Sequence, residues 1–200
     1  EDGVTHHGVF DMAAFGAVPG LTVAAPMNEP ELRNMMWPGL QAGAPFMIRY
    51  PRGLGEGLPW RGLPFETLPV GRGRRLREGR DVALVTVGTV GNAAARAAEH
   101  AAAQGVEAAH YDLRWVKPLD TELLDEVGRT FRRVITVEDG CLRGGVGEAV
   151  AAYFNARGYD AHVTCLGIGD AWVEHGTPEQ LHALCGYDEE SIFRALTQPV

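Results

Sequence analysis

The chain has 200 residues, of which 46% are hydrophobic and 22% are charged, and its formal net charge is −8. This composition supplies a sizeable core and excludes a chain that is disordered throughout. The acidic balance argues against a nucleic-acid-binding protein, which usually carries a basic face. No apolar run approaches the roughly 20 residues of a membrane span.

Residues 1–52 predict the end of an α/β domain. Apolar runs at 21–25 and 46–50 predict two strands, and Asn28 is a suitable N-cap for a helix from 29 to about 39. Two strands and one helix bury too little surface for a stable domain. Because the chain also lacks an initiator Met and a signal peptide, we expect a fragment or a processed product.

Residues 53–80 predict a linker. Glycine and proline recur from Gly53 to Pro59 and again around Gly71 and Gly73, so this stretch could hardly sustain a helix.

Residues 81–200 predict a compact domain in which strands and helices alternate. Strands are expected at 82–87, 107–113, 134–138 and 161–166, and helices at 91–104, 120–129, 146–156 and, after a short one that follows Thr177, 189–197. Asp120 is a suitable N-cap, Gly158 suits a helix end, and Thr177 begins a capping box. This alternation predicts an α/β fold with a mainly parallel sheet covered by helices.

The cysteines Cys141, Cys165 and Cys185 are widely spaced and form no CxxC pair. This pattern argues against a disulfide framework or a structural zinc site. Reduced thiols predict a cytoplasmic protein. Cys165 lies in a predicted buried strand and Cys141 in a loop without a nearby histidine, so a nucleophilic role has little support.

The segment 2–8, Asp-Gly-Val-Thr-His-His-Gly, is the first candidate site. It holds a carboxylate, a hydroxyl and two imidazoles between glycines. Such a loop suits proton transfer near neutral pH, where imidazole changes its charge. If the segment is extended, His6 and His7 face opposite sides and only one can face a given pocket. The alternative is a solvated loop whose histidines bind backbone groups.

Arg49-Tyr-Pro-Arg52-Gly53 is the second candidate site. It follows a predicted strand, and open α/β sheets bind ligands at the carboxyl ends of their strands. The arginine guanidinium is planar and suits phosphate or carboxylate. The alternative is a weak surface ion pair.

Two further motifs favour structural roles. The glycines that follow Glu138-Asp139 match neither a dinucleotide fingerprint nor a P-loop, so close packing or a tight turn explains them better. The segment 172–176, Trp-Val-Glu-His-Gly, contains no HExxH zinc motif, and we expect a packing or interface role.

Five segments resemble, in the right order, motifs of the 1-deoxy-D-xylulose-5-phosphate synthase family. They are Glu1–Asp11 (DGPTHHGxFD), Ala25–Leu32 (APxxExEL), Arg49–Gly53 (RYPRG), Val116–Asp120 (VKPLD) and Glu174–Gly176 (EHG). Val4 stands where the family usually has Pro, and Arg143 where an apolar residue is commoner. Transketolases resemble the first motif less, because they usually lack the His-Gly pair.

The resemblance implies an enzyme of three α/β domains that uses thiamine diphosphate and Mg²⁺. It would condense pyruvate with glyceraldehyde 3-phosphate, release carbon dioxide and supply isoprenoid, thiamine and pyridoxal phosphate synthesis. This chain would hold the end of the pyrimidine-binding domain (1–52), a linker (53–80) and the C-terminal domain (81–200) of a homodimer. The cofactor and metal ligands would lie mainly upstream.

Residue by residue, the resemblance implies that His6 is the active-site histidine near the transferring protons. Asp2 would be the acidic residue that cooperates with it, and Arg52 would hold the phosphate of the aldehyde. It assigns no role to His7. Two alternatives stay open: a non-catalytic dimerisation or scaffold module, and another transketolase or α-ketoacid dehydrogenase subunit.

Overall fold

The computed structural model describes residues 3–198, and its larger sheet has five strands. Their order is β3 (Arg74–Arg77), β5 (Ala108–Asp112), β4 (Val82–Val87), β7 (Arg133–Cys141) and β8 (His162–Ile168). β5, β4, β7 and β8 run parallel, and β3 pairs antiparallel with β5 at one edge. The predicted mainly parallel sheet is therefore confirmed, whereas β3 lies within the stretch expected to be a linker.

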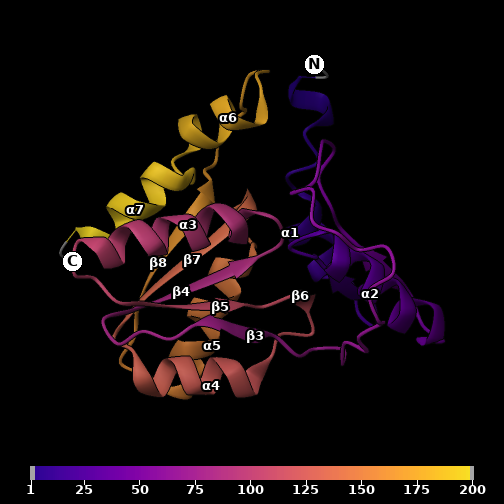
Figure 1. Cartoon of the computed structure of the whole chain (residues 1–200), viewed down its shortest axis with the longest axis horizontal. Helices are drawn as coiled ribbons and strands as arrows, with labels where there is room; N and C mark the ends of the chain where they lie inside the picture. Colours follow the sequence, from indigo (N-terminus) through magenta and orange to yellow (C-terminus); the bar gives the residue numbers. More distant parts are fainter. Residues whose placement is uncertain (1–2, 199–200) are drawn as a thin grey trace.

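Helices cover both faces of this sheet (Figure 1). One face carries α3 (Val90–Ala103) and α7 (Glu189–Thr197), and the other carries α4 (Thr121–Thr130) and α5 (Val146–Arg157). The short α6 (Pro178–Cys185) follows β8. This arrangement is the α/β architecture that the alternation of elements predicts.

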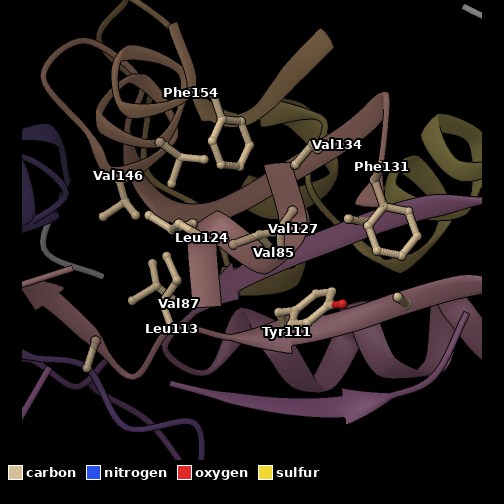
Figure 2. Packing of buried hydrophobic residues seen from close by; sticks show 14 of the residues in the cluster. Val85, Val87, Tyr111, Leu113, Leu124, Val127, Phe131, Val134, Val146 and Phe154 are labelled. Carbon is tan, nitrogen blue, oxygen red and sulfur yellow. The ribbon is translucent and has the colours of Figure 1, made fainter. Parts of the chain in front are cut away.

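The central strand β4 supplies both cores. Val82 and Leu84 pack on the side of α3 and α7, whereas Val85 and Val87 pack on the side of α4 and α5. Figure 2 shows the second core, where Leu124 of α4 and other apolar side chains surround Val85 and Val87. Alternate strand residues point to opposite faces, so the continuous apolar run of β4 follows from burial on both sides.

A second, three-stranded sheet joins the N-terminal zone to the middle of the sequence. Its order is β2 (Phe46–Ile48), β1 (Thr22–Ala24) and β6 (Trp115–Lys117). β1 and β2 are parallel, and β6 pairs antiparallel with β1. β6 belongs to the zone expected to be a separate C-terminal domain, and it was not predicted. The first zone therefore gains its third strand from the same chain.

Trp115 of β6 fills the core of this small sheet. Its side chain is fully buried with Ala24, Met35 and Leu68, and its ring meets Phe46 edge to face with centroids 5.9 Å apart. The indole Nε1 donates a hydrogen bond to the carbonyl oxygen of Arg72 at 3.1 Å. The side chain of Trp115 thus connects three parts of the chain: the first zone, the stretch that follows it, and β6.

The helix caps agree with the sequence signals. Asn28 Oδ1 accepts from the Glu31 amide at 3.1 Å and begins α2 (Glu29–Gln41). Thr177 and Gln180 form the reciprocal capping box of α6, and Asp120 caps α4. Two short helices before β1, η1 (Val4–His6) and α1 (Asp11–Gly16), were not predicted.

Large apolar side chains remain exposed mainly in residues 10–70. They include Met36, Trp37 and Leu40 on α2, with Leu54 and Phe65 in the following stretch. The exposed apolar surface of the described residues thus lies mainly on the first zone and on the stretch that follows it. Among the helices within residues 3–198, none has both the length and the apolar character to cross a bilayer.

Candidate functional site

The segment that carries His6 is a single 3₁₀ turn. It lies between Gly3 and Gly8, whose φ angles of +72° and +67° favour glycine. His6 is exposed, and its Nδ1 lies 2.8 Å from Thr5 Oγ1, whereas His7 is half-buried. The segment is therefore not extended. The prediction that His6 and His7 face opposite sides assumed an extended segment, so its premise was wrong. The two imidazoles still diverge, because successive residues of a 3₁₀ helix lie about 120° apart around its axis.

Asp2, the expected partner of His6, lies outside the described residues. Val4, which stands where the family usually has Pro, is the first residue of η1. The proton-transfer roles of His6 and Asp2 stay predictions.

Arg49 is a buried ion-pairing residue. Its side chain is 8% exposed, its Nε donates to Asp11 Oδ2 at 3.1 Å, and its Nη2 donates to the carbonyl oxygen (2.6 Å) and Oδ2 (3.1 Å) of Asp139. Burial alone would lower the pKa of Arg49, but the carboxylates of Asp139 and Asp11 outweigh burial and raise it. Arg49 is therefore committed to the protein and does not face a ligand.

Arg52, the second arginine of this motif, lies three residues after Arg49. It follows Pro51 beyond the end of β2 and is exposed. The two arginines of the motif are thus divided between the interior and the surface. Phosphate binding by Arg52 stays a prediction. The alternative interpretation of this motif was a weak surface ion pair; Arg49 does form ion pairs, but they are buried.

The network around Arg49 continues into the C-terminal part of the chain. Tyr187, between α6 and α7, donates its hydroxyl hydrogen to Asp139 Oδ1 at 2.9 Å, and His182 Nε2 lies 3.9 Å from the same oxygen. Burial, followed by the charge of Asp139, raises the pKa of Tyr187. Asp11 and Asp139 lie within motifs of the sequence, but the sequence assigns neither a role, because their pairing with Arg49 is non-local.

The glycine-rich entry to α5 is filled by the protein's own carboxylate. Glu138 accepts hydrogen bonds from the amides of Val146 (2.9 Å) and Gly147 (2.8 Å). A Cβ atom on Gly145 would lie 2.6 Å from Glu138 Oε2 and 2.4 Å from the carbonyl oxygen of Cys141. The close-packing interpretation of these glycines is confirmed.

Trp172 borders a shallow groove of about 320 Å³, together with Phe10, Cys141 and Arg143. Its ring meets Phe10 edge to face with centroids 5.7 Å apart, yet Trp172 is 74% exposed. The packing role expected for this segment therefore applies to Val173, which packs against the core on the side of α3 and α7, and to the contact of Trp172 with Phe10. Glu174 and His175 are exposed.

The three cysteines are free and half-buried. Burial raises the pKa of each thiol, so none is activated as a thiolate. Cys165 is less buried than expected because its strand, β8, forms the sheet edge.

A second buried polar cluster lies where α2 meets β3 and β5, and it was not predicted. Arg114 Nε and Nη2 lie 2.8 and 2.7 Å from Glu31 Oε1, and Arg74 contacts both Glu31 (3.1 Å) and Asp112 (3.2 Å). Burial, and then the nearby charge of Glu31, raises the pKa of Asp112 to about 7. The cluster carries two acids and two arginines, and it joins α2 to β3 and β5 of the larger sheet.

Within residues 3–198, no group of three or more His, Cys, Asp or Glu side chains could hold a metal ion. The buried side-chain atoms without a hydrogen-bond partner, Glu29 Oε2, Arg77 Nε and Thr136 Oγ1, lie on three different elements.

Two family models cover most of the sequence. The transketolase C-terminal domain matches residues 71–192, and the transketolase pyrimidine-binding domain matches residues 1–56. The chain therefore belongs to the transketolase family. This membership agrees with the observed helix-covered parallel sheet.

Relatives within that family are more specific. The chain is 49% identical over 200 residues to 1-deoxy-D-xylulose-5-phosphate synthase of Bacteroides fragilis, and 42% identical over 193 residues to that of Carboxydothermus hydrogenoformans. These matches take in 99% and 96% of this chain but only 31% of each relative. The chain thus spans about a third of the length of these curated relatives.

A solved chain of a split-gene transketolase, described as an inactive beta4 tetramer, has the same fold. It superposes with a TM-score of 0.84 at 28% sequence identity, over 96% of this chain and 61% of that one.

Proposed function

We propose that this chain is the C-terminal part of a 1-deoxy-D-xylulose-5-phosphate synthase. The complete enzyme would condense pyruvate with glyceraldehyde 3-phosphate and release carbon dioxide, in the first step of a route to isoprenoids. The observation that carries the proposal is the 49% identity to a synthase over 99% of the chain. The retained histidine loop and the arginine turn support it.

In this proposal the cofactor binds mainly upstream, as the resemblance to the synthase family implies. Thiamine diphosphate, bound with Mg²⁺, would supply the electron sink for decarboxylation. The residues of this chain would do the remaining work. His6, exposed and flanked by glycines, would accept and return a proton, and Arg52 would bind the phosphate of the aldehyde.

The 28% identical inactive tetramer supports a further part of the proposal. We propose that this chain alone is inactive and needs the upstream domains and a second copy of the enzyme. The exposed apolar residues of α2 agree with such a requirement. A cytoplasmic homodimer stays part of this proposal.

The competing functions make different predictions. A scaffold module would require none of His6, Asp2 or Arg52 for turnover. A transketolase would use a ketose phosphate as donor and release no carbon dioxide. The identity of the chain to the synthases, well above its 28% identity to the split-gene transketolase, favours the synthase.

The test is an assay of the complete enzyme with thiamine diphosphate and Mg²⁺. Carbon dioxide release from carboxyl-labelled pyruvate should depend on glyceraldehyde 3-phosphate and yield 1-deoxyxylulose 5-phosphate. Activity with a ketose phosphate instead of pyruvate would contradict the proposal. Calorimetric titration of the 200-residue chain alone should detect no micromolar cofactor binding.

A further inference from the structure

Arg49 connects the two segments that carry the candidate site residues. It lies three residues before Arg52, and its guanidinium holds Asp11, five residues after His6. Its remaining hydrogen bonds go to Asp139, near the end of β7. One side chain therefore connects both segments to β7 of the larger sheet.

The His6 side of this connection is fixed by three hydrogen bonds. The Asp11 amide donates to the Gly8 carbonyl at 3.3 Å, and Asp11 Oδ1 accepts from the Met12 amide at 2.7 Å. The Cys141 amide donates to the Val9 carbonyl at 2.9 Å. The residues that follow the histidine loop are thus held against β7 at two points.

The Arg52 side is fixed by the backbone of Arg49 itself. Its amide donates to the Ala24 carbonyl at 2.8 Å and extends the pairing of β2 with β1. Arg49, Asp139 and Asp11 have side chains only 8%, 15% and 20% exposed. A network this buried has few alternative arrangements, and a lysine could not reproduce the two directions of the guanidinium donors.

On the basis of the proposed function, we infer that Arg49 is a positioning residue for the acceptor site. It places Arg52 relative to the histidine loop and so sets the preference for a phosphorylated aldehyde. It does not touch substrate, because its donors face Asp11 and Asp139. Its effect on the preference for the phosphate must therefore pass through Arg52, the residue proposed to bind that group.

The test compares two acceptors in the complete enzyme, glyceraldehyde 3-phosphate and glyceraldehyde. Arg49→Gln should lower the ratio of kcat/KM for the phosphorylated over the unphosphorylated acceptor by at least about tenfold. Arg49→Lys should recover part of the ratio, and the KM for pyruvate should change little. An equal loss with both acceptors would show a merely structural role and overturn the inference.

A double-mutant cycle separates positioning from general damage. In an Arg52→Ala background, Arg49→Gln should not reduce the acceptor ratio further, because the residue through which it acts is gone. Independent, additive losses would overturn the inference. If Arg49→Gln does not fold, Asp139→Asn, which removes the charge that Arg49 Nη2 contacts, must change the ratio in the same direction.

Arg133→Gln is the matched control. Arg133 lies at the opposite end of β7 and donates to the carbonyl oxygens of Ala195, Leu196 and Gln198. Its loss should lower the melting temperature without changing the acceptor ratio. A wild-type enzyme that makes no 1-deoxyxylulose 5-phosphate would refute the proposed function, whereas an active enzyme with an unchanged ratio in the Arg49 variants would refute this inference alone.

Discussion

Arg114 Nη2 lies 2.7 Å from Glu31 Oε1, and this ion pair joins α2 to the turn that leads from β5 to β6. Both side chains are less than 10% exposed. Removing one member of a buried ion pair leaves an uncompensated charge, which typically costs about 3–5 kcal/mol. We expect Arg114→Met to lower the free energy of unfolding by about 3 kcal/mol in urea titrations, because Arg74 still contacts Glu31.

The control for this prediction is Arg132→Met. Arg132 pairs with Asp160 at 3.1 Å, but the two side chains are 88% and 85% exposed. Pairs of this kind contribute about 0–1 kcal/mol. Equal losses in the two variants would mean that burial does not strengthen the Arg114 pair.

Trp115 should be among the most costly side chains to truncate. Trp115→Ala removes the centre of the small core and leaves the Arg72 carbonyl without its indole donor. A loss of about 3–5 kcal/mol in the free energy of unfolding is expected. Trp172→Ala, which truncates a largely exposed ring, should change it by less than about 1 kcal/mol.

The buried imidazole of His110 should make the stability of the fold depend on pH in the acidic range. Burial, together with the charge of Arg74, lowers the pKa of His110 to about 4, and its Nε2 lies 2.9 Å from Thr86 Oγ1. Between pH 6.5 and about 4 the unfolded chain binds the extra proton, so this group makes stability fall as pH falls. His110→Gln should remove that slope in unfolding measurements across this range.

The contribution of Asp112 to the pH dependence of stability should be opposite in sign to that of His110. Its raised pKa means that the folded state holds the extra proton between about pH 4 and 7, so this group makes stability fall as pH rises. Asp112→Asn should therefore leave a steeper loss of stability toward acid than the wild type shows. Parallel slopes in the two variants would contradict both assignments.

His6 is expected to matter for turnover and not for stability. His6→Ala in the complete enzyme should lower kcat by about 10²–10⁴, the usual contribution of a general acid or base. The melting temperature should hardly change, because the imidazole is exposed. His7→Ala is the paired control, and an enzyme insensitive to His6→Ala would return the loop to a solvated, structural role.

Arg52 should discriminate between the two substrates. Arg52→Ala should raise the KM for glyceraldehyde 3-phosphate by at least about tenfold, whereas the KM for pyruvate, which carries no phosphate, should change much less. Arg52→Lys should rescue only part of the loss, since a point charge replaces a planar fork. Steady-state kinetics with each substrate varied in turn measures both values.

The parts of the fold that local signals determine could be predicted from the sequence. The apolar run of β4 and the caps Asp120 and Thr177 lie where the sequence places them. β6 could not be predicted in this way, because three residues carry no period and their partner, β1, is far away in sequence. Short strands depend on the core that they complete, here the pocket for Trp115.

The candidate site was predictable only at the level of motifs. The sequence places Arg49 and Arg52 in one strand-end motif with the same chemistry, but it does not reveal which of them turns inward. That choice depends on Asp11 and Asp139, which come from two other elements. Local composition therefore identifies the segment, whereas non-local charges decide the role of each residue.

The pairing of β6 with β1 also affects the order in which this protein can mature. During synthesis β1 and β2 leave the ribosome long before β6. When β6 emerges, only β3, β4 and β5 of the larger sheet have been made. The small sheet can therefore gain its outer strand, β6, only after three strands of the larger sheet have been made. The pairing of β6 with β1 is a long-range contact, and such contacts slow folding. Nascent chains that stall before Trp115 would leave β1 with an unpaired edge and make it the natural place for chaperones to bind.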